Sequence, residues 1–414
     1  MRRRQFIGLA SAACAGMSAR SDSAREERSV PPRNRRPYSD VDWDKCIEIR
    51  TTSHVHCLNQ QMLDNCLAAG YDLLTISNYY PSAPCFPARR MTRGYYAVHH
   101  DFPVMVNGVR HEGPIDWNRT IAPWAAEIDG ECRERYPLVE RGPMFQRVPE
   151  GILEAPNAEH HRFIGSPCHM CSLGSMHATG TFDRGDKFRT RSRGGFHPGV
   201  GEPWQTALRR MFDALVVPDG GGVTINHPSW SSLKDAHVRE LLDFDPRVLG
   251  LEVLNAPGLH QTVKKDAPWT HATDEDYWDR TLATGRQCFG FFVPDWGARR
   301  EVPQGMNILL VKERTVPACL QAYRKGDFYG ALKGQGALKF RAIRFDGKKF
   351  TVALDKKAHL QVLSAQGVIE SRTATALEIA VPAEECQVHV YLRARAYALD
   401  GSGEAIYTQP QMLV

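Results

Sequence analysis

The sequence predicts an α/β protein, in which a distorted β/α barrel of the TIM-like kind is followed by a small all-β sandwich domain. Apolar strands of the parallel type alternate with helical patterns through residues 204–293. Histidine or aspartate follows the carboxyl ends of several of these strands, as catalytic groups do in barrels. After Gly330 the pattern changes to short alternating segments separated by Gly, Asp and Lys turns, which indicates the second domain.

The alternation begins near Trp43. Residues 47–53 form a short strand-like run that leads into His54-Val55-His56. A helical pattern over 62–67 follows and stops at Gly70, and residues 71–77 predict a second strand.

The alternation resumes after a long gap. The expected helices span 204–215, 236–242 and 274–285, and the expected strands span 222–226, 249–254 and 287–293. These strands are almost wholly apolar, which is typical of strands that are covered on both faces.

We therefore divide the chain into a signal and linker at 1–40, a barrel at 41–330 and a sandwich domain at 331–414. Within the barrel, residues from about 79 to 154 are rich in Pro, Arg, Gly and aromatics and have little periodicity. This segment is interpreted as an insertion over the mouth of the barrel.

The first residues indicate export. Arg2-Arg3-Arg4-Gln5-Phe6-Ile7 precedes a short apolar stretch of small residues that is too short to span a bilayer. Two arginines, a spacer, Phe and an aliphatic residue resemble a twin-arginine signal, which moves folded proteins. We expect a periplasmic or secreted protein without a membrane span. A lipid anchor at Cys14 stays open, although Ser11 stands where Leu is usual.

Composition narrows the choice of partners. The 414 residues carry a formal net charge of +5, but the excess of arginine lies in the first 40 residues. The body lacks a basic stripe interleaved with aromatics, so we expect a small-molecule substrate and no nucleic acid. Eleven cysteines at irregular spacing define no disulfide framework. Oligomeric state is not predicted.

Six side chains are candidate metal ligands. His54 and His56 are two apart at a strand end, so both point to one face. Several later elements also end in nitrogen or oxygen ligands. The four candidate ligands at these later positions are Glu159, His169, His227 and Asp295.

These motifs, taken in order, resemble the PHP (polymerase and histidinol phosphatase) superfamily of metal-dependent hydrolases. The resemblance covers roughly residues 45–325. Its elements are the opening His-x-His at 54–56, Glu159 with His169 to Gly174, Gly222 to Pro228, Leu251 to Asn255, and Trp278 to Gly285. Segments 326–330, 390–393 and 403–410 resemble the β-domain of the carbaryl hydrolase-like branch. The resemblance implies a PHP-type barrel.

The resemblance also implies a ligand arrangement. His54, His56, Glu159 and Asp295 would hold one ion, and Glu159 would bridge to a second ion held by the last two candidates, His169 and His227. The family's Thr-Asp-His is replaced by Ser77-Asn78-Tyr79, and its Asp-x-His by Asp295-Trp296-Gly297. Both losses fall on groups associated with a third ion, so one or two divalent ions (Zn, Mn or Fe) are expected.

The expected chemistry is hydrolysis. A divalent ion generates hydroxide near neutral pH and polarises the bond under attack, here a phosphoester, ester or carbamate. A proton donor is also needed, and His160, His161 or His177 could serve, although each could equally be a structural histidine. Arg110, His111 and Glu112 could contact an anionic substrate or could form a solvated loop.

Two other readings stay open. An amidohydrolase-type barrel also begins with His-x-His, but it normally adds a strand-borne Lys between the opening pair and the later histidines. The one apolar strand here that ends in Lys, 308–312, comes after all the candidate ligands. A degenerate exported binding protein would keep the barrel without turnover, and Asn78, Tyr79 and Gly297 favour that reading.

Overall fold

The structure of the protein is a computed structural model, in which residues 33–414 belong to one unit. The segments that it describes are 32–78, 88–93, 143–161, 163–177, 203–255, 274–299, 304–333 and 338–414, with short strands between 95 and 141 and at 179–182.

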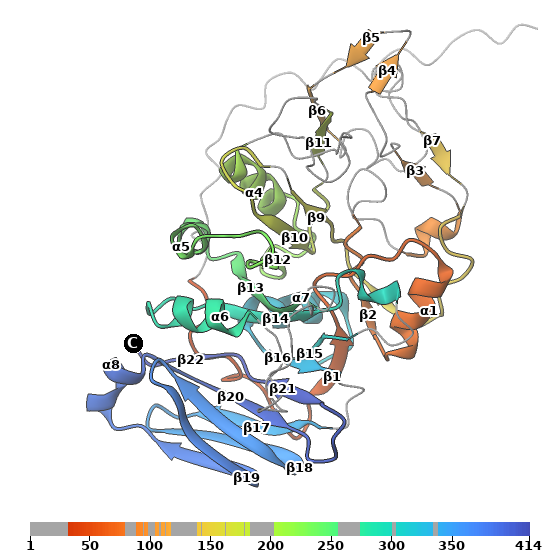
Figure 1. Ribbon diagram of the computed structural model, residues 1–414. Coiled ribbons are helices and arrows are strands. Elements are labelled where there is room, and N and C mark those ends of the chain that lie inside the picture. The colour runs from red at the N-terminus through yellow and green to blue at the C-terminus, as the bar shows by residue number, and fades with distance from the viewer. Residues whose placement is uncertain are drawn as a thin grey trace, which may run out of the picture. The chain divides into compact units, whose positions relative to one another are not determined.

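The larger sheet has nine strands, all paired antiparallel. It runs from β1 to the long hairpin of β18 and β19 (Figure 1). Its strands are β1 (Ile47–Thr51), β15 (Met306–Val311), β16 (Phe328–Leu332), β21 (Ala405–Tyr407), β20 (Tyr391–Tyr397), β18 (Lys349–Ser364), β17 (Phe340–Phe345), β19 (Gly367–Ala380) and β22 (Gln411–Met412).

The second sheet has five strands in the order β14-β13-β12-β10-β9. The pairs β14–β13 and β13–β12 are parallel, whereas β12–β10 and β10–β9 are antiparallel. The strands are β9 (Glu159–His160), β10 (His169–Leu173), β12 (Gly222–Asn226), β13 (Val248–Asn255) and β14 (Phe289–Val293). A short parallel pair joins β2 (Leu73–Leu74) to β8 (Leu153–Glu154).

The described part of the chain contains six α-helices. They are α1 (Gln60–Ala68), α4 (Trp204–Asp213), α5 (Asp235–Phe244), α6 (Glu275–Leu282), α7 (Val316–Lys325) and α8 (Cys386–His389). Helices α4, α5 and α6 lie along the five-stranded sheet, and their buried faces contact β12 and β13 (Figure 1). The Asn59 side chain caps α1 by accepting a hydrogen bond from the Met62 amide.

The predicted TIM-like barrel with a separate sandwich is wrong. The protein consists mostly of strands, with few helices, and antiparallel pairing dominates. Only a short connection joins β9 to β10, and a parallel crossover needs a dozen or more residues. The strands after residue 330 extend the sheet of β1, β15 and β16 through β21.

Several sequence predictions fall outside the described residues. These include the whole export signal, Cys14, Tyr79 and much of the predicted insertion. Besides 88–93 and 143–154, the described parts of the insertion are β3 (Tyr95–Ala97), β4 (Val104–Val106), β5 (Val109–His111), β6 (Gly113–Asp116) and β7 (Val139–Arg141). The domain limits, the export route and the lipid anchor stay predictions. Within the described residues, the structure has no helix with the length and apolarity needed to cross a bilayer.

Candidate metal centre

The site forms where the chain leaves β1. Val55 makes a parallel bridge with Asp295: the Asp295 amide donates to the His54 carbonyl at 3.1 Å, and the His56 amide donates to the Asp295 carbonyl at 3.0 Å. Successive side chains of extended backbone point to opposite faces. Val55 therefore enters the hydrophobic core, while His54 and His56 face the cluster.

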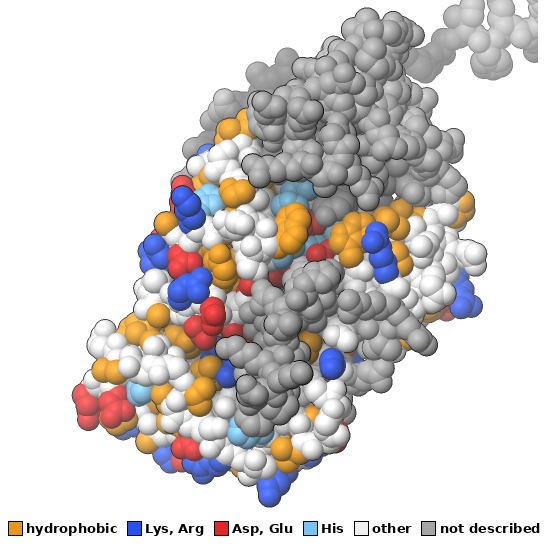
Figure 2. Space-filling model, viewed as in Figure 1, with side chains coloured by type: hydrophobic (Ala, Val, Ile, Leu, Met, Phe, Trp, Pro, Cys, Tyr) orange, Lys and Arg blue, Asp and Glu red, His pale blue; other side chains and the backbone are white. Residues whose placement is uncertain are grey.

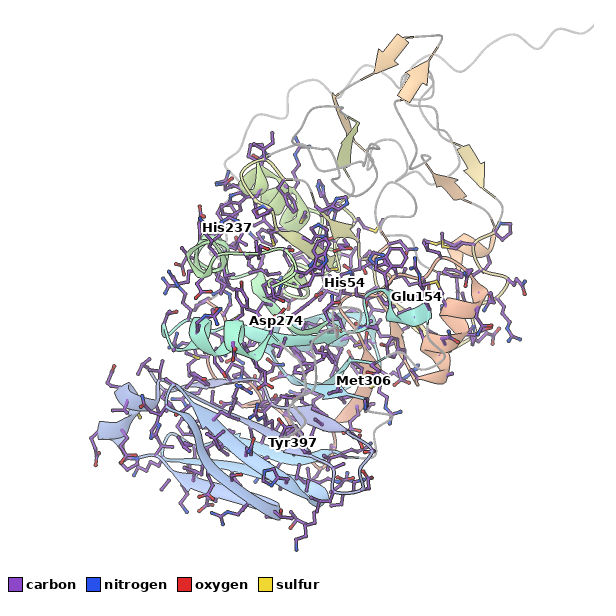
Figure 3. The ribbon with its side chains drawn as sticks, in the orientation of Figure 1. His54, Glu154, His237, Asp274, Met306 and Tyr397 are labelled. Carbon is purple, nitrogen blue, oxygen red and sulfur yellow. The ribbon has the colours of Figure 1, made fainter. Side chains whose placement is uncertain are left out.

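Glu159 is brought to this cluster by the short strand β9. Its amide donates to the Ser77 carbonyl at 3.0 Å, and its register partner in β10 is Cys171. The Glu159 side chain is completely buried. Figure 3 shows His54 between the five-stranded sheet and the segment of β1 and α1, away from Tyr397 in the large sheet.

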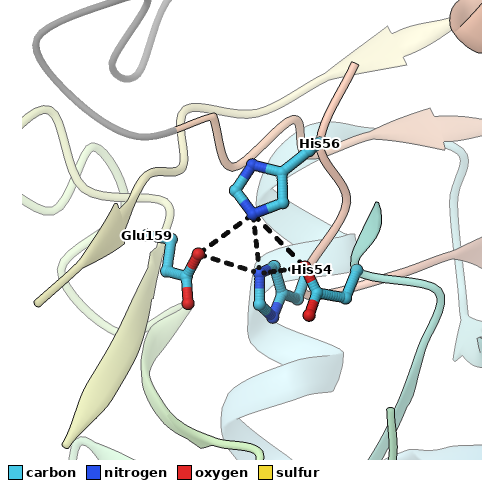
Figure 4. A group of neighbouring side chains, drawn as sticks. His54, His56 and Glu159 are labelled. Atoms are coloured by element: carbon cyan, nitrogen blue, oxygen red, sulfur yellow. Dashed lines mark hydrogen bonds and ion pairs between the residues drawn. The ribbon is translucent and has the colours of Figure 1, made fainter. Parts of the chain in front are cut away.

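The first group of ligand atoms, the inner set, consists of His54 Nε2, His56 Nε2, Glu159 Oε2 and Asp295 Oδ1. The two ring nitrogens are 3.2 Å apart. Glu159 Oε2 lies 3.2 Å from the His54 nitrogen and 3.0 Å from the His56 nitrogen, and Asp295 Oδ1 lies 3.2 and 3.3 Å from the same two atoms (Figure 4).

The second group, the outer set, shares Glu159 through its other oxygen. Glu159 Oε1 lies 2.9 Å from His169 Nδ1 and 3.2 Å from His227 Nε2. His169 begins β10 opposite Asn226, and His227 follows Asn226 at the end of β12. Adjacent strand ends thus place the two rings 4.9 Å apart, and one carboxylate connects both sets.

The donor set and its spacing fit divalent metal ions. Four ligands at 2.0 to 2.1 Å from a tetrahedral ion would be separated from one another by roughly 3.3 Å. The five separations that involve a histidine nitrogen of the inner set, 3.0 to 3.3 Å, are close to this value. Imidazole nitrogens and carboxylate oxygens together suit Zn, Mn or Fe. The structure brings together all six predicted ligand residues, and their role as ligands stays a prediction.

Charge explains why so many ionisable groups are buried together. Burial alone would lower the pKa of His54, but the carboxylates of Asp295 and Glu159 raise it well above its ordinary value. Burial alone would raise the pKa of Asp295, but His54 and His56 hold it at about 2. The cluster therefore favours positive charge among its carboxylates, which a proton or a metal ion can supply.

Glu252 is a buried acid beside the cluster, and the sequence reasoning left it without a role. It is completely buried in β13, and its Oε1 lies 2.7 Å from His54 Nδ1. Its Oε2 accepts hydrogen bonds from the His227 amide at 2.8 Å and from Asn255 Nδ2 at 2.9 Å. A carboxylate behind a ligand imidazole fixes the orientation of the ring. An acid within the apolar run 248–254 was the signal that could have identified it.

Asn78 lies at one of the two positions where an expected family ligand is missing. Its side chain stabilises the loop that follows His56. Its Oδ1 accepts from the Cys57 amide at 2.8 Å, and its Nδ2 donates to the Cys57 carbonyl at 2.7 Å. In the other motif that lacks a family ligand, 295–297, Trp296 stacks on His56, with ring centroids 4.1 Å apart and an interplanar angle of 19°. These residues therefore support the segment that carries His56.

The candidate proton donors lie in different surroundings. His160 is buried behind Glu159, and its Nε2 lies 2.8 Å from Ser172 Oγ. Its ring stacks near that of His177 with centroids 5.8 Å apart. His161 instead packs edge-on against His169 at 5.0 Å. His161 therefore contacts a residue of the outer set. The side chains of Arg110, His111 and Glu112 lie outside the described residues.

Two ligand residues have strained backbone. His227 has a φ of +28° and Asp295 a φ of +48°, values that residues other than glycine seldom adopt. Such conformations cost about 1 to 3 kcal/mol each and concentrate at functional sites. Their occurrence at two candidate ligands supports a functional role for the cluster.

Comparison with known proteins gives a distant likeness. No family model matches the chain, and no curated protein matches it. A solved structure from Bacteroides vulgatus, a two-domain protein containing a predicted PHP-like metal-dependent phosphoesterase, is 12% identical and has a TM-score of 0.36. The match covers 84% of this chain and 90% of that one. A likeness of this extent assigns neither a fold nor an activity to this chain, and the carbaryl hydrolase-like branch is not confirmed.

Proposed function

We propose that the protein is a metal-dependent hydrolase that binds two divalent ions and cleaves a phosphoester, ester or carbamate bond. The observation that carries the proposal is the position of Glu159. Its two carboxylate oxygens face separate groups of imidazole and carboxylate ligands at 2.9 to 3.2 Å. A carboxylate shared in this way is suited to bridging two ions.

The residues of the two sets and their neighbours would have different roles. A bound divalent ion would supply a hydroxide near neutral pH and polarise the substrate. His54, His56 and Asp295 would hold one ion, and Glu252 would fix the His54 ring through Nδ1. His169 and His227 would hold the other ion beside His161, which we assign as the proton donor to the leaving group.

The substrate is expected to be a small molecule, and the resemblance to PHP proteins favours a phosphoester among the three bond types. The export signal fits an enzyme that acts in the periplasm or outside the cell, and a twin-arginine route would allow the ions to be loaded before export. Both points remain proposals.

Elemental analysis of the purified protein tests the proposal. We expect about two equivalents of Zn, Mn or Fe per chain, and hydrolysis of model phosphoesters or carbamates that a chelator abolishes. His389→Ala is a matched control, because His389 contacts Ser364 in the region of the large sheet. Tightly bound metal without turnover would instead favour the degenerate binding protein. Absence of metal from well-folded protein would overturn the metal centre.

An amidohydrolase-type site is less well supported. That class adds a Lys as a bridging ligand between two sets of ligands, whereas the inner and outer sets here share the Glu159 carboxylate. Glu159 occupies the bridging position between them.

A further inference from the structure

Trp230 is the most exposed large hydrophobic residue in the described part of the chain, with 69% of its surface accessible. Its chain neighbours Ser229 and Ser232 are exposed and polar, whereas Pro228 and Leu233 are buried, so the exposed apolar surface of this turn is mainly the indole ring. By contrast, Trp204 and Trp278 are buried in the core. A single exposed aromatic ring offers too small an apolar area for a protein partner, but enough for part of a small ligand.

The turn that carries Trp230 is fixed to a candidate ligand. The Ser231 amide donates to the His227 carbonyl at 3.1 Å, and Ser231 Oγ lies 3.2 Å from His227 Nδ1. The Leu233 amide closes the turn on the Pro228 carbonyl at 3.0 Å. Trp230 is therefore held close to the backbone of His227 while its ring remains in solvent.

The Trp230 ring borders the outer set directly. Its centroid lies 4.9 Å from that of His227 and 5.2 Å from that of His169, with interplanar angles of 77° and 72°. Figure 2 shows pale blue histidine and red acidic side chains beside orange hydrophobic groups on this face. An accessible aromatic surface thus adjoins the ions that the two imidazoles would hold.

We propose that Trp230 forms an aromatic subsite next to the outer set, and that the preferred substrates are anionic esters that carry a flat aromatic group. The inference rests on the proposed function and deepens it. The anionic head would bind at the metal centre, and the aromatic group would pack on the indole. Aromatic pairs attract each other beyond the effect of the area that they bury.

Binding of two non-hydrolysable anions tests this subsite. Phenylphosphonate and methylphosphonate share the anionic head and differ in the aromatic ring. We expect the metal-loaded protein to bind phenylphosphonate about tenfold more tightly by calorimetry. Trp230→Ala should reduce this ratio to about one, and Trp230→Phe should retain part of it. Neither variant should lose metal, because Trp230 supplies no ligand atom.

Leu399→Ala is the matched control, because Leu399 is also an exposed apolar side chain and lies in the turn between β20 and β21. It should leave the ratio unchanged. Equal affinities in the parent, no binding of either anion, or an unaltered ratio in Trp230→Ala would overturn the subsite. Metal content and chelator-sensitive hydrolysis are measured separately, so the hydrolase proposal can stand if the subsite fails. Absence of both metal and turnover would overturn the hydrolase proposal itself.

Discussion

The inner and outer sets share Glu159 but differ in how completely the protein surrounds them. The inner set offers four ligand atoms, and three of its side chains, His54, His56 and Glu159, are completely buried. The outer set offers three atoms, and its His169 side chain is 13% exposed. Four protein ligands are typical of closed structural sites, and three are typical of catalytic sites that keep a position for water or substrate. The difference indicates that the inner ion would anchor the centre and that the outer ion would meet the substrate.

The largest effect is expected from Glu159→Ala, which removes a ligand from both sets. Bound metal should fall from about two equivalents toward zero, and the hydrolysis rate should fall by about 10³-fold or more. Elemental analysis and steady-state kinetics measure the two losses. Glu378→Ala, which changes an exposed acid of β19, is the control. Retention of two ions in the Glu159 variant would contradict the shared bridge.

His54→Ala and His169→Ala separate the two sets. His54→Ala should remove the inner ion and activity together while the fold stays mostly intact. His169→Ala should remove the outer ion and activity but leave about one equivalent. Metal titrations, with circular dichroism for folding, distinguish these outcomes. Unchanged metal content in His54→Ala would rule out the inner site, and loss of both ions in His169→Ala would show that the sets do not differ as proposed.

Glu252→Gln tests whether the carboxylate behind His54 supports the inner set. Gln can still hydrogen bond to the ring but lacks the charge, so the affinity for the inner ion should fall by about 10- to 100-fold. Competition with a chromophoric chelator measures this change. The unfolding midpoint of the metal-free variant serves as the control for a general loss of stability. An unchanged affinity would remove Glu252 from the centre.

Asp327 is a buried acid outside the cluster, and its pKa shift is opposite in direction to that of Asp295. Asp327 accepts a hydrogen bond from the Tyr38 amide at 2.8 Å, and burial raises its pKa to about 6. Its unfolded pKa is about 3.9, so the folded state binds the proton more tightly. The stabilisation from the protonated form is present below about pH 4 and is lost as the pH rises through about 6.

Asp327→Asn should therefore raise the free energy of unfolding by about 2 kcal/mol at pH 7 and have little effect at pH 4. Urea denaturation at both pH values measures the difference. Asp295 has the opposite shift, to about 2, because it faces His54 and His56. Equal effects at pH 4 and pH 7 would refute the assignment for Asp327.

The sequence predicted local elements better than their pairing. The expected strand at 222–226 coincides with β12, and the helical pattern at 62–67 lies within α1. Apolar composition indicates burial on both faces but does not fix strand direction. Short alternating segments were expected after Gly330, but residues 349–364 form the single long strand β18. The barrel prediction was wrong because it assumed a parallel neighbour for each apolar strand.

Four of the six candidate ligands were foreseeable from short patterns. His54 and His56 form His-x-His, and His227 and Asp295 follow apolar strands. The contacts that support these residues could not be foreseen from the sequence. Asn78 reaches Cys57 across 21 positions, and Glu252 reaches His54 across 198. Such contacts depend on the three-dimensional arrangement of segments, and no local periodicity encodes them.

The same long separations have a consequence for folding kinetics. Contacts between residues far apart in the chain form slowly, because loop closure costs entropy before the contact is made. The two sets draw on segments from His54 to Asp295, so high-affinity metal capture should appear late in refolding, after most of the secondary structure. The time course of metal binding during refolding would then report the rate of the last stage of folding.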